Sequence, residues 1–171
     1  MKIRTIALTL ALLTLPALAE PADRDQPVNI EADRVIVDDR NKTHTFEGSV
    51  VLTQGTLEIR GDKMVVVQGP DGFQTGVATG TPERPATFRQ RREGTNDYVE
   101  GQAERIEYDT RAERARLFQS ARVSSGGDQV TGDFIEYDAL TERYYASNTP
   151  GPASDGRVRA VIQPRASDAP Q

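Results

Sequence analysis

Side chains able to carry catalysis or to bind a metal ion are scarce in this 171-residue chain. There is one histidine, His44, and there is no cysteine, so zinc and iron–sulfur sites built on thiolates are excluded. A lone histidine cannot build a metal site without carboxylate partners, and its place beside a turn indicates an exposed loop or strand residue. We therefore expect no metal site and no cofactor.

Carboxylates are the one abundant reactive group, with 26 Asp and Glu residues. A pair of them could act as in glycosidases, and Asp38, Asp39 and Asp128 could bind calcium. Most carboxylates fall in turns or at outward strand positions, however, and no loop has the spacing of an EF-hand. Neither a Gly-x-Ser-x-Gly nucleophile motif nor a G-x-x-x-x-G-K-[ST] phosphate loop occurs. The sequence therefore predicts a protein that is not an enzyme and has no catalytic residues.

Residues 1–19 have the layout of a secretory signal peptide. Lys2 and Arg4 precede a short apolar run, residues 6–15, and residues 17–19 (ALA) form a small-x-small cleavage pattern. The apolar run is shorter than the about 20 residues that span a bilayer. An uncleaved membrane anchor is therefore the less favoured alternative.

Length and charge suit one exported domain. We expect residues 20–164 to form a single domain and residues 165–171 a flexible tail, in the periplasm. Without the signal peptide the chain has 19 basic and 26 acidic residues, a net charge of −7, which argues against nucleic acid as a partner. Because cysteine is absent, the core and hydrogen bonds must hold the exported domain together without disulfides.

The mature chain alternates apolar and polar residues with the two-residue period of half-buried strands. From Phe46 to Leu52 every second position carries Phe, Gly, Val or Leu, and Leu57 and Ile59 flank a polar Glu. Turn signals rich in Gly, Asp, Asn and Pro separate such runs at short spacing. The segment 112–117 (AERARL) is too short for a helix, so we interpret it as a charged turn and the start of a strand. These patterns predict an all-β sandwich or jelly roll.

A gapless internal repeat relates two long segments of the mature chain. Residues 32–67 placed on residues 103–138 give eight identities in 36 positions, where ordinary composition gives roughly two. The identities are mainly turn residues, and the apolar positions coincide in class. Such a repeat implies two stacked β-units, each of which covers the apolar face of its neighbour. The terminal strands then lack a neighbour, so their backbone groups are open for pairing.

Six motifs in order carry a resemblance to a known family. They are residues 26–33 (QPVNIEAD), 45–50 (TFEGSV), 53–63 (TQGT and GDK at its ends), 85–88 (PATF), 99–101 (VEG) and 132–137 (GDFIEY). In these motifs, in their order, in length and in the signal peptide, the chain resembles the OstA-like family. The resemblance covers nearly all of the mature chain.

The resemblance to the OstA-like family implies both a fold and a function. The fold is an open, twisted antiparallel β-jelly roll built from two similar halves, with an apolar interior. The function is to bind lipopolysaccharide through its lipid A acyl chains and to relay it across the periplasm for outer-membrane assembly. The implied partners are further copies of the chain, assembled head to tail, LptC of the inner-membrane export complex and LptD of the outer-membrane translocon.

The candidate lining of this interior consists of apolar residues at inward strand positions. From the residues alone the same set is expected of any sandwich with a filled core, and it is the resemblance that favours a lipid-binding groove. The predicted lipid-binding residues are Val28, Ile30, Val35, Val37, Phe46, Val50, Leu52, Leu57, Ile59, Met64, Val66, Phe88, Ile106, Tyr108, Leu117, Val123, Ile135 and Tyr137.

Three local features leave alternatives open. Asp128 stands where Leu57 stands in the first unit, so either that inward position is polar or a bulge turns Asp128 outward. The basic segment 89–92 either contacts lipid phosphates or is a solvated turn, and we favour the turn. The open edges for head-to-tail pairing are expected near residues 28–30 and at residues 157–163.

Two other functions compete with the lipopolysaccharide bridge. One is an inner-membrane-anchored relative with the same fold, against which the cleavable pattern at residues 17–19 argues. The other is a periplasmic binding or scaffold module with a filled core and no lipid. Lipid capture by a photo-crosslinker in the interior separates this last alternative from the other two.

Overall fold

The fold is built from β-strands. The computed structural model describes residues 23–92, 94–149 and 156–164, so the predicted signal peptide and tail lie outside the described residues. Within these ranges, none of the helical segments has the length and apolar character of a membrane span. The described elements are η1 (Asp23–Asp25), β1 (Val28–Glu31), β2 (Arg34–Asp38), β3 (Thr43–Gln54), β4 (Leu57–Gly69), β5 (Gly72–Thr79), β6 (Ala86–Arg91), β7 (Tyr98–Ala103), β8 (Arg105–Asp109), β9 (Arg114–Ser125), β10 (Asp128–Asp138), β11 (Arg143–Ser147) and β12 (Arg159–Val161).

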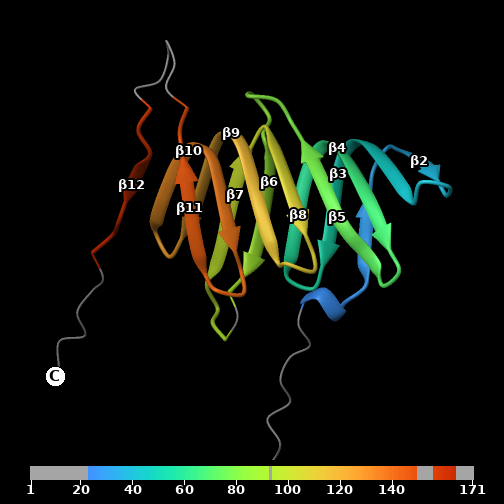
Figure 1. The fold of residues 1–171 in the computed structure, drawn as a ribbon, viewed down its shortest axis with the longest axis horizontal. Helices are drawn as coiled ribbons and strands as arrows, with labels where there is room; N and C mark the ends of the chain where they lie inside the picture. The colour runs from blue at the N-terminus through green and yellow to red at the C-terminus, as the bar shows by residue number, and fades with distance from the viewer. Residues whose placement is uncertain (1–22, 93, 150–155, 165–171) are drawn as a thin grey trace, which may run out of the picture.

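The strands form two antiparallel layers that share four long strands. Each of β3, β4, β9 and β10 runs from one layer into the other, with a bend between its halves. Layer A contains, in order, β2, β3, β4, β5, β8, β9, β10 and β11. Layer B contains β1, β3, β4, β6, β7, β9, β10 and β12. In Figure 1, β2 lies at one end of the molecule, and β11 and β12 lie at the other.

The predicted internal repeat is present in the strand pairing. β1 and β2 pair with β3 in the same register in which β7 and β8 pair with β9. The bulge at Gly48 and Ser49 of β3 also returns, at Gln119 and Ser120 of β9, with positive φ at all four residues. We call β1–β6 the first repeat and β7–β12 the second repeat. The prediction of two similar halves is confirmed.

The bends of the long strands lie along one long side of the molecule, which we call the hinge side. The connections from β1 to β2 and from β5 to β6 also pass between the layers there. Backbone hydrogen bonds tie these crossings together, since Asp33 N donates to Gly48 O (3.2 Å) and Gly80 N donates to Glu104 O (2.9 Å). Gly48 has a φ of +86°, and an added Cβ would lie 2.1 Å from the Asp33 carboxylate, so a side chain at this position would clash with Asp33.

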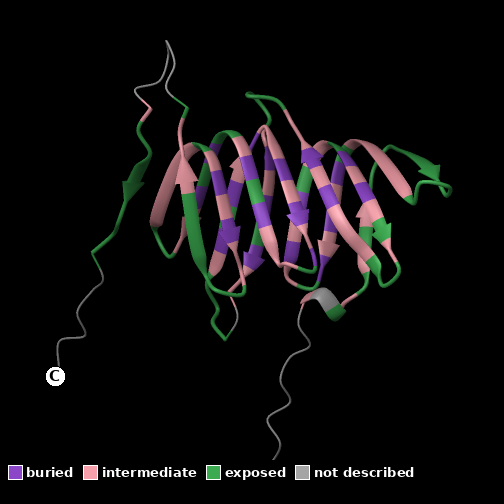
Figure 2. Cartoon of the chain, viewed as in Figure 1, coloured by how far each residue is buried: buried purple, intermediate pink, exposed green. Residues whose placement is uncertain are grey.

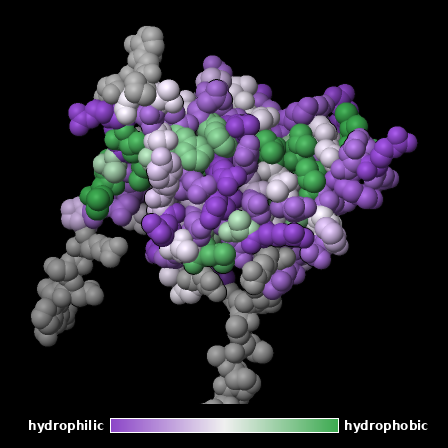
Figure 3. All heavy atoms as spheres, in the orientation of Figure 1, coloured by the Kyte–Doolittle hydropathy of each residue, from purple (hydrophilic) through white to green (hydrophobic). Residues whose placement is uncertain are grey.

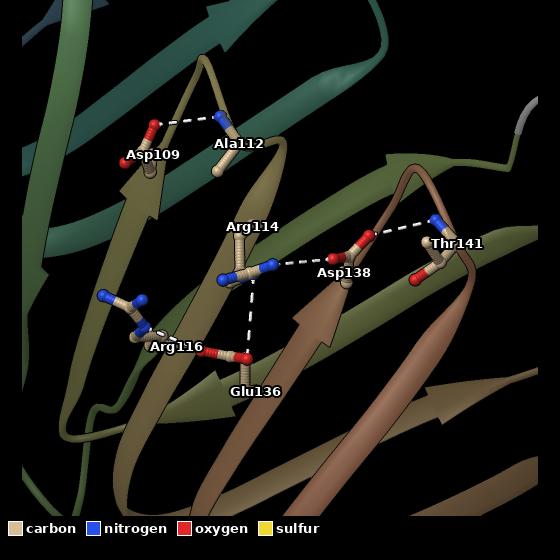
Figure 4. Close-up of polar contacts among 7 residues, drawn as sticks. All are labelled: Asp109, Ala112, Arg114, Arg116, Glu136, Asp138 and Thr141. Atoms are coloured by element: carbon tan, nitrogen blue, oxygen red, sulfur yellow. Dashed lines mark hydrogen bonds and ion pairs between the residues drawn. The ribbon is translucent and has the colours of Figure 1, made fainter.

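The opposite long side carries the hairpin turns, and we call it the turn side. In layer A the turns after β2, β8 and β10 begin with Asp38, Asp109 and Asp138. In each turn the Asp Oδ1 accepts the backbone N–H of the residue three positions later at 3.0 Å, as Figure 4 shows for the last two. One turn design, used three times, therefore ends these strands.

The middle of the molecule is a closed ring of six strands, β4, β5, β8, β9, β7 and β6. The ring closes because β4 and β9 belong to both layers and because the repeats pair with each other twice, β5 with β8 and β6 with β7. We call these two pairings the internal seam. An all-β antiparallel fold is confirmed, but the expected open roll is closed here. Pairing at the seam satisfies backbone groups that an open edge would leave exposed.

Two local predictions have different outcomes. The segment 112–117 is a turn that leads into β9 at Arg114, so the predicted charged turn and strand start are confirmed. The favoured interpretation of residues 89–92 as a solvated turn is wrong, because residues 89–91 belong to β6 and Gln90 is buried. Alternation along β6 turns Arg89 and Arg91 outward and Gln90 inward.

Candidate functional site

An apolar interior lies between the two layers, and Figure 2 shows its buried positions alternating along the strands. Thirteen of the predicted lining residues are at most 4% exposed and belong to one cluster. They come from both layers and both repeats, so the outward and inward faces were assigned correctly. These residues are Val50, Leu52, Leu57, Ile59, Met64, Val66, Phe88, Ile106, Tyr108, Leu117, Val123, Ile135 and Tyr137.

The other five predicted lining residues lie toward the end of the molecule where the chain begins. Val28, Ile30 and Phe46 are partly buried and pack against the cluster. Val35 and Val37 lie on β2, which pairs only with β3 among the described strands, and they are 51% and 52% exposed. The structure therefore places these two valines at an open edge rather than in the packed interior.

Sequence reasoning missed several interior residues. Val99 is fully buried, as are Ala78, Ala86, Ala103 and Ala115. An alanine gives little signal in an apolar pattern because its side chain is a single methyl group, which buries little apolar area. Val99 could have been found, since extending the gapless match toward the N-terminus places it on Val28, which was among the predicted residues.

Phe88 fills the centre of the interior. It lies on β6 opposite Gly101 of β7, where an added Cβ would meet the Phe88 ring at 2.4 Å and Leu117 at 2.8 Å. Its ring stacks on Tyr137 of β10, with 6.3 Å between centroids, and Tyr137 stacks on Tyr144 of β11 at 4.8 Å. The aromatic series therefore crosses from layer B to layer A and runs toward the end formed by β11 and β12.

Each end of the interior opens into a cavity. The larger cavity, about 660 Å³, lies between β12 and the turn after β9 and is lined by Tyr144, Val130 and Ile162 among others. The smaller one, about 260 Å³, is lined by Val28 and Ile30 of layer B and by Phe46, Val66 and Phe73 of layer A. The first volume is in the range of sites that hold small ligands. The interior is thus filled in the middle and accessible at both ends.

Polar side chains join the two layers across the turn side. Arg92, just after β6, donates two hydrogen bonds to Glu142 in the turn before β11, at 3.1 Å from Nε and 2.5 Å from Nη2. The Tyr108 hydroxyl lies beside Gln90 of layer B, and burial raises the pKa of this tyrosine. The Tyr144 hydroxyl lies beside Ser125 in the same way. These contacts, together with apolar packing, join the two layers at the turn side in the described part of the chain.

The chain matches the family model described as the LptA and LptD N-terminal domain lipopolysaccharide transport protein, over residues 29–143. The match covers more than half of the chain and reaches from β1 to the first residue of β11. The chain belongs to this LptA/LptD N-terminal domain family. Its lipopolysaccharide-transport assignment, suspected from the motifs, is thus confirmed at the level of the family.

Comparison with individual proteins supports the assignment to the LptA/LptD N-terminal domain family. The lipopolysaccharide export system protein LptA of Escherichia coli K12 is 32% identical over 159 residues, which cover 93% of this chain and 83% of that protein. The export system protein LptH of Pseudomonas aeruginosa PAO1 is 30% identical, covering 92% of this chain and 91% of that protein. The crystal structure of LptH, described as the periplasmic LptA-homologous component of the transport device, superimposes with a TM-score of 0.76. It is 28% identical and covers 84% of this chain and all of that chain.

Asp128 shows where this member of the LptA/LptD N-terminal domain family has a polar interior position. Asp128 pairs with Ser125 without interruption, as Leu57 pairs with Gln54, so the alternative of a bulge at Asp128 is wrong. Its Oδ1 accepts the backbone N–H of Gln163 at 2.8 Å, and the residue lines the larger cavity. This inward position is polar because the Asp128 side chain contacts the backbone that follows β12 instead of packing in the apolar core.

His44 and Arg89 also have structural surroundings that explain them in this family member. His44 lies on β3, as one of the two expected positions, but it is half-buried and tilted against Phe46, so the prediction of an exposed histidine is wrong. The Arg89 guanidinium lies 3.7 Å from the centre of the Tyr98 ring and forms an ion pair with Glu100 at 3.0 Å. These contacts account for Arg89 without a phosphate ligand.

Proposed function

We propose that this chain binds lipopolysaccharide through its acyl chains in the interior between layers A and B and passes it toward the outer membrane. The observation that carries the proposal is the continuous apolar interior, filled at Phe88 and open at both ends, in a member of a lipopolysaccharide transport family. The eighteen predicted lining residues are the proposed lipid-binding set. No catalytic step and no cofactor is part of this function.

Lipid entry requires the packed interior to open. Burial contributes about 0.8 kcal/mol for each CH₂ group, so a chain of about a dozen carbons gains on the order of 10 kcal/mol when enclosed. Protein interiors are close-packed, so acyl chains must displace side chains such as Phe88 or push the layers apart. At the hinge side the layers are joined by the continuous backbone of the long strands, whereas at the turn side they are joined by side-chain packing and by side-chain contacts such as that of Arg92 with Glu142. We therefore propose that the layers separate at the turn side.

The end cavities offer the starting points for this separation. Tyr144, Tyr137 and Phe88 form a stacked series from the larger cavity to the centre. An acyl chain entering the larger cavity meets these rings in turn, and the ion pair of Arg92 with Glu142 spans the turn side at the same end. The sequence has no phosphate loop for a nucleotide, so the energy for directional movement is proposed to come from the export machinery.

The proposed partners follow from the open edges and from the family. Copies of the chain assemble head to tail, and the inner-membrane LptC and the outer-membrane LptD complete the bridge at its two ends. The family model is shared with the N-terminal domain of LptD, which supports LptD as a partner with a matching edge. A periplasmic location is supported by the predicted signal peptide and by LptH, described as a periplasmic component.

A photo-crosslinking experiment tests lipid binding. A photoreactive phenylalanine analogue is placed at Phe46, beside the smaller cavity, or at Tyr108, in the interior, and the purified protein is illuminated with lipopolysaccharide. The matched control is Phe118, which lies next to the inward Leu117 but faces outward beneath the Arg105 guanidinium, 4.1 Å from its ring centre. We expect crosslinked lipid at Phe46 and Tyr108 and background labelling at Phe118.

The same experiment decides the main alternative. The closed ring and the filled centre favour, as a second candidate, a periplasmic scaffold module whose core only stabilises the fold. Equal, low labelling at all three positions, with each variant unfolding like the unmodified protein, would support the scaffold module and reject lipid binding.

A further inference from the structure

The beginning of the described chain is attached to the turn side of layer B by the Asp23 carboxylate. Its Oδ1 accepts the backbone N–H of Thr56 at 2.7 Å, and its Oδ2 accepts the Thr56 hydroxyl at 2.7 Å. Oδ2 also accepts a hydrogen bond from Gln90 Nε2 at 3.0 Å. Thr56 belongs to the turn between β3 and β4, and Gln90 belongs to β6. We call these three donor groups of Thr56 and Gln90 the Asp23 site.

The Asp23 site is built to hold an anion. Thr56 Oγ1 accepts the backbone N–H of Arg91 at 3.2 Å, so its own hydroxyl hydrogen is left to point at the carboxylate. Gly55 has a φ of +57°, and an added Cβ would lie 2.3 Å from Asp23 Oδ1. The missing side chain at Gly55 therefore makes room for the anion. A backbone amide, a hydroxyl and a side-chain amide that converge in this way form an anion-binding site of uncharged donors.

The Asp23 site lies at the rim of the apolar interior. Gln90 is 8% exposed and points inward from β6, as does Phe88 two residues before it. Inward residues that are two positions apart on a strand are separated by about 7 Å. The Tyr108 hydroxyl of layer A lies beside Gln90, and burial, together with the negative charges of Glu113 and Asp23, raises the pKa of Tyr108. An acyl chain bound beside Phe88 would therefore have its polar head group close to the Asp23 site.

The second repeat forms the equivalent turn without these groups. Residues 126–127 (GG) connect β9 to β10 as residues 55–56 (GT) connect β3 to β4, and the first glycine of each turn has a positive φ. The second repeat thus has no hydroxyl at this turn, and the constant spacing of the repeat places Gly94 where the first repeat has Asp23. The larger cavity opens at this turn instead. The turn itself therefore does not require a carboxylate beside it.

We propose that the Asp23 site binds a phosphate group of the lipid head group, and that the Asp23 carboxylate occupies the site until lipid enters. This inference rests on the lipid binding of the proposed function and adds a position for the head group. A phosphate group offers three oxygen acceptors, which take the same kinds of hydrogen bond as a carboxylate. Asp23 is thus an internal competitor, and it leaves the donors when the layers separate at the turn side.

The polarity of the surface agrees with this division of the lipid between two environments. Figure 3 shows hydrophobic side chains over the β12 end and near the β2 end, whereas the Asp23 site on the turn side consists of polar donors. A phosphate that replaces the carboxylate uses the same hydrogen bonds. The exchange therefore changes the free energy little in either direction, which suits a protein that must also release its lipid.

Inorganic phosphate tests the site without lipid. In Asp23→Ala protein the donors are vacant, so about 20 mM phosphate should raise its melting temperature by about 2 °C or more relative to chloride of equal ionic strength. The unmodified protein and Asp25→Ala protein should show smaller shifts. Asp25 is the matched control because it is exposed and lies on the same short segment with the same charge. Equal shifts in all three proteins would show an adventitious ion only and reject the site.

Lipopolysaccharide capture tests the competition. Asp23→Ala should raise the apparent affinity for lipopolysaccharide roughly three- to tenfold, because a larger fraction of the molecules is then ready to bind. Lipopolysaccharide from which the phosphate groups have been removed should show no such gain, and Asp25→Ala should show no gain with either lipid.

Two further variants identify the groups involved. Adding Thr56→Val to Asp23→Ala removes the hydroxyl donor and should abolish most of the gain for the phosphorylated lipid. Asp23→Asn keeps a side chain of the same shape without the charge, so its gain should lie between those of the unmodified protein and Asp23→Ala. Asp23→Asn also keeps the test valid if Asp23→Ala folds poorly.

Other results would overturn the proposal in distinguishable ways. Equal gains for phosphorylated and dephosphorylated lipid would show that Asp23 only obstructs entry, so the phosphate site would be rejected while lipid binding stands. No gain with either lipid would show that Asp23 only anchors the beginning of the domain. If unmodified protein captures neither lipid, the proposed function fails, and stabilisation by inorganic phosphate would then report a site for free anions alone.

Discussion

The two repeats of this molecule have the same strand registers but different outer faces. On the outside of layer A, the second repeat carries cross-strand ion pairs, seen in Figure 4, whereas the first repeat has uncharged side chains at the same positions. The ion pairs join Arg114 to Asp138 at 2.8 Å and Arg116 to Glu136 at 2.8 Å. The equivalent pairs in the first repeat are Thr43 opposite Val67 and Thr45 opposite Val65.

This difference indicates that the inward-facing residues and the bends of the long strands, rather than the outward-facing residues, specify the fold. The bulges at Gly48 and Gln119 are the same although one residue is glycine and the other is not. The inward positions Leu52 and Val123 are both apolar and buried. Surface pairs contribute little to stability in most proteins, so they are free to diverge between repeats.

A second comparison contrasts the internal seam with the free ends. The same strand positions are buried at the seam and exposed at the ends, so equivalent substitutions should have unequal effects.

The largest expected effect is the difference in stability between Leu52→Asp and Val37→Asp. Both residues were predicted from the sequence to line the interior. Leu52 is fully buried, so an unpaired carboxylate there should cost several kcal/mol or prevent folding. Val37 is 52% exposed, so Val37→Asp should change the free energy of unfolding of the isolated chain by about 0.5 kcal/mol or less. Urea unfolding at low protein concentration measures both. Similar losses would mean that β2 is covered in the single chain.

A finer comparison uses Ile106 of the seam and Val35, its counterpart at the free end. Ile106→Ala should lose about 2–5 kcal/mol of unfolding free energy because it leaves a cavity in the core. Val35→Ala should lose about 0.5 kcal/mol or less in the isolated chain. At concentrations where chains associate, Val35→Ala should also weaken association. A loss for Val35→Ala in the monomer as large as that expected for Ile106→Ala would contradict the assignment of a free edge.

The third prediction concerns the acid sensitivity of the second repeat. The hydrogen bonds from Arg114 and Thr141 lower the pKa of Asp138 to about 2. Because an unfolded Asp has a pKa of about 3.9, the stabilisation from Asp138 is complete above that value and is lost as pH falls toward about 2. Asp138→Asn should therefore lower the melting temperature at pH 6, and the difference from the unmodified protein should shrink between pH 4 and pH 2.

Asp38 is the matched control for this measurement. Its pKa is also lowered, but by hydrogen bonds from Asn41, which carries no charge. High salt should therefore reduce the effect of Asp138→Asn more than that of Asp38→Asn. Equal salt dependence for the two variants would show that the Arg114 ion pair does not account for the difference between the repeats.

The smallest effect on stability is expected at the turn side. Arg92→Ala removes the ion pair with Glu142 that spans layers A and B and should cost about 1 kcal/mol or less. If the layers separate there, the variant should capture lipopolysaccharide faster than the unmodified chain. Arg111→Ala is the control, because Arg111 pairs with Asp71 within layer A. Faster capture by both variants, or by neither, would contradict the proposed opening.

Much of the fold was accessible from the sequence because the repeat and the alternation are local or periodic signals. The gapless match found the pairs β2/β8, β3/β9 and β4/β10. The match could not extend to the edge strands β11 and β12. In the structure, Ala146 of β11 is the counterpart of Ala78, and Ala160 of β12 is the counterpart of Phe88. Neither pair of residues is separated by the constant number of residues that relates the rest of the repeat. The connections before these strands differ in length between the repeats, so the role of Tyr144 could not be predicted.

Within the candidate site, the inward set was predictable, but its packing was not. Alternation assigned Phe88 and Tyr137 to the interior, yet only the structure shows that they stack on each other between layers and fill the centre. The basic segment 89–92 was misinterpreted because three arginines outweighed the alternation that placed Gln90 inward. Asp128 was recognised as unusual, and its polar partner, the backbone of Gln163, comes from a distant part of the chain.

By itself, the sequence determined the strand class, the two repeats and the inward faces, because the alternation along each strand and the gapless repeat are properties of the chain alone. Only the tertiary structure decided which strands close the ring, where the interior is filled and which edges stay open. Those outcomes depend on contacts between residues far apart in sequence. Val35 and Ile106 show the reason: equivalent apolar positions in the two repeats become exposed or buried according to whether another strand lies beside them.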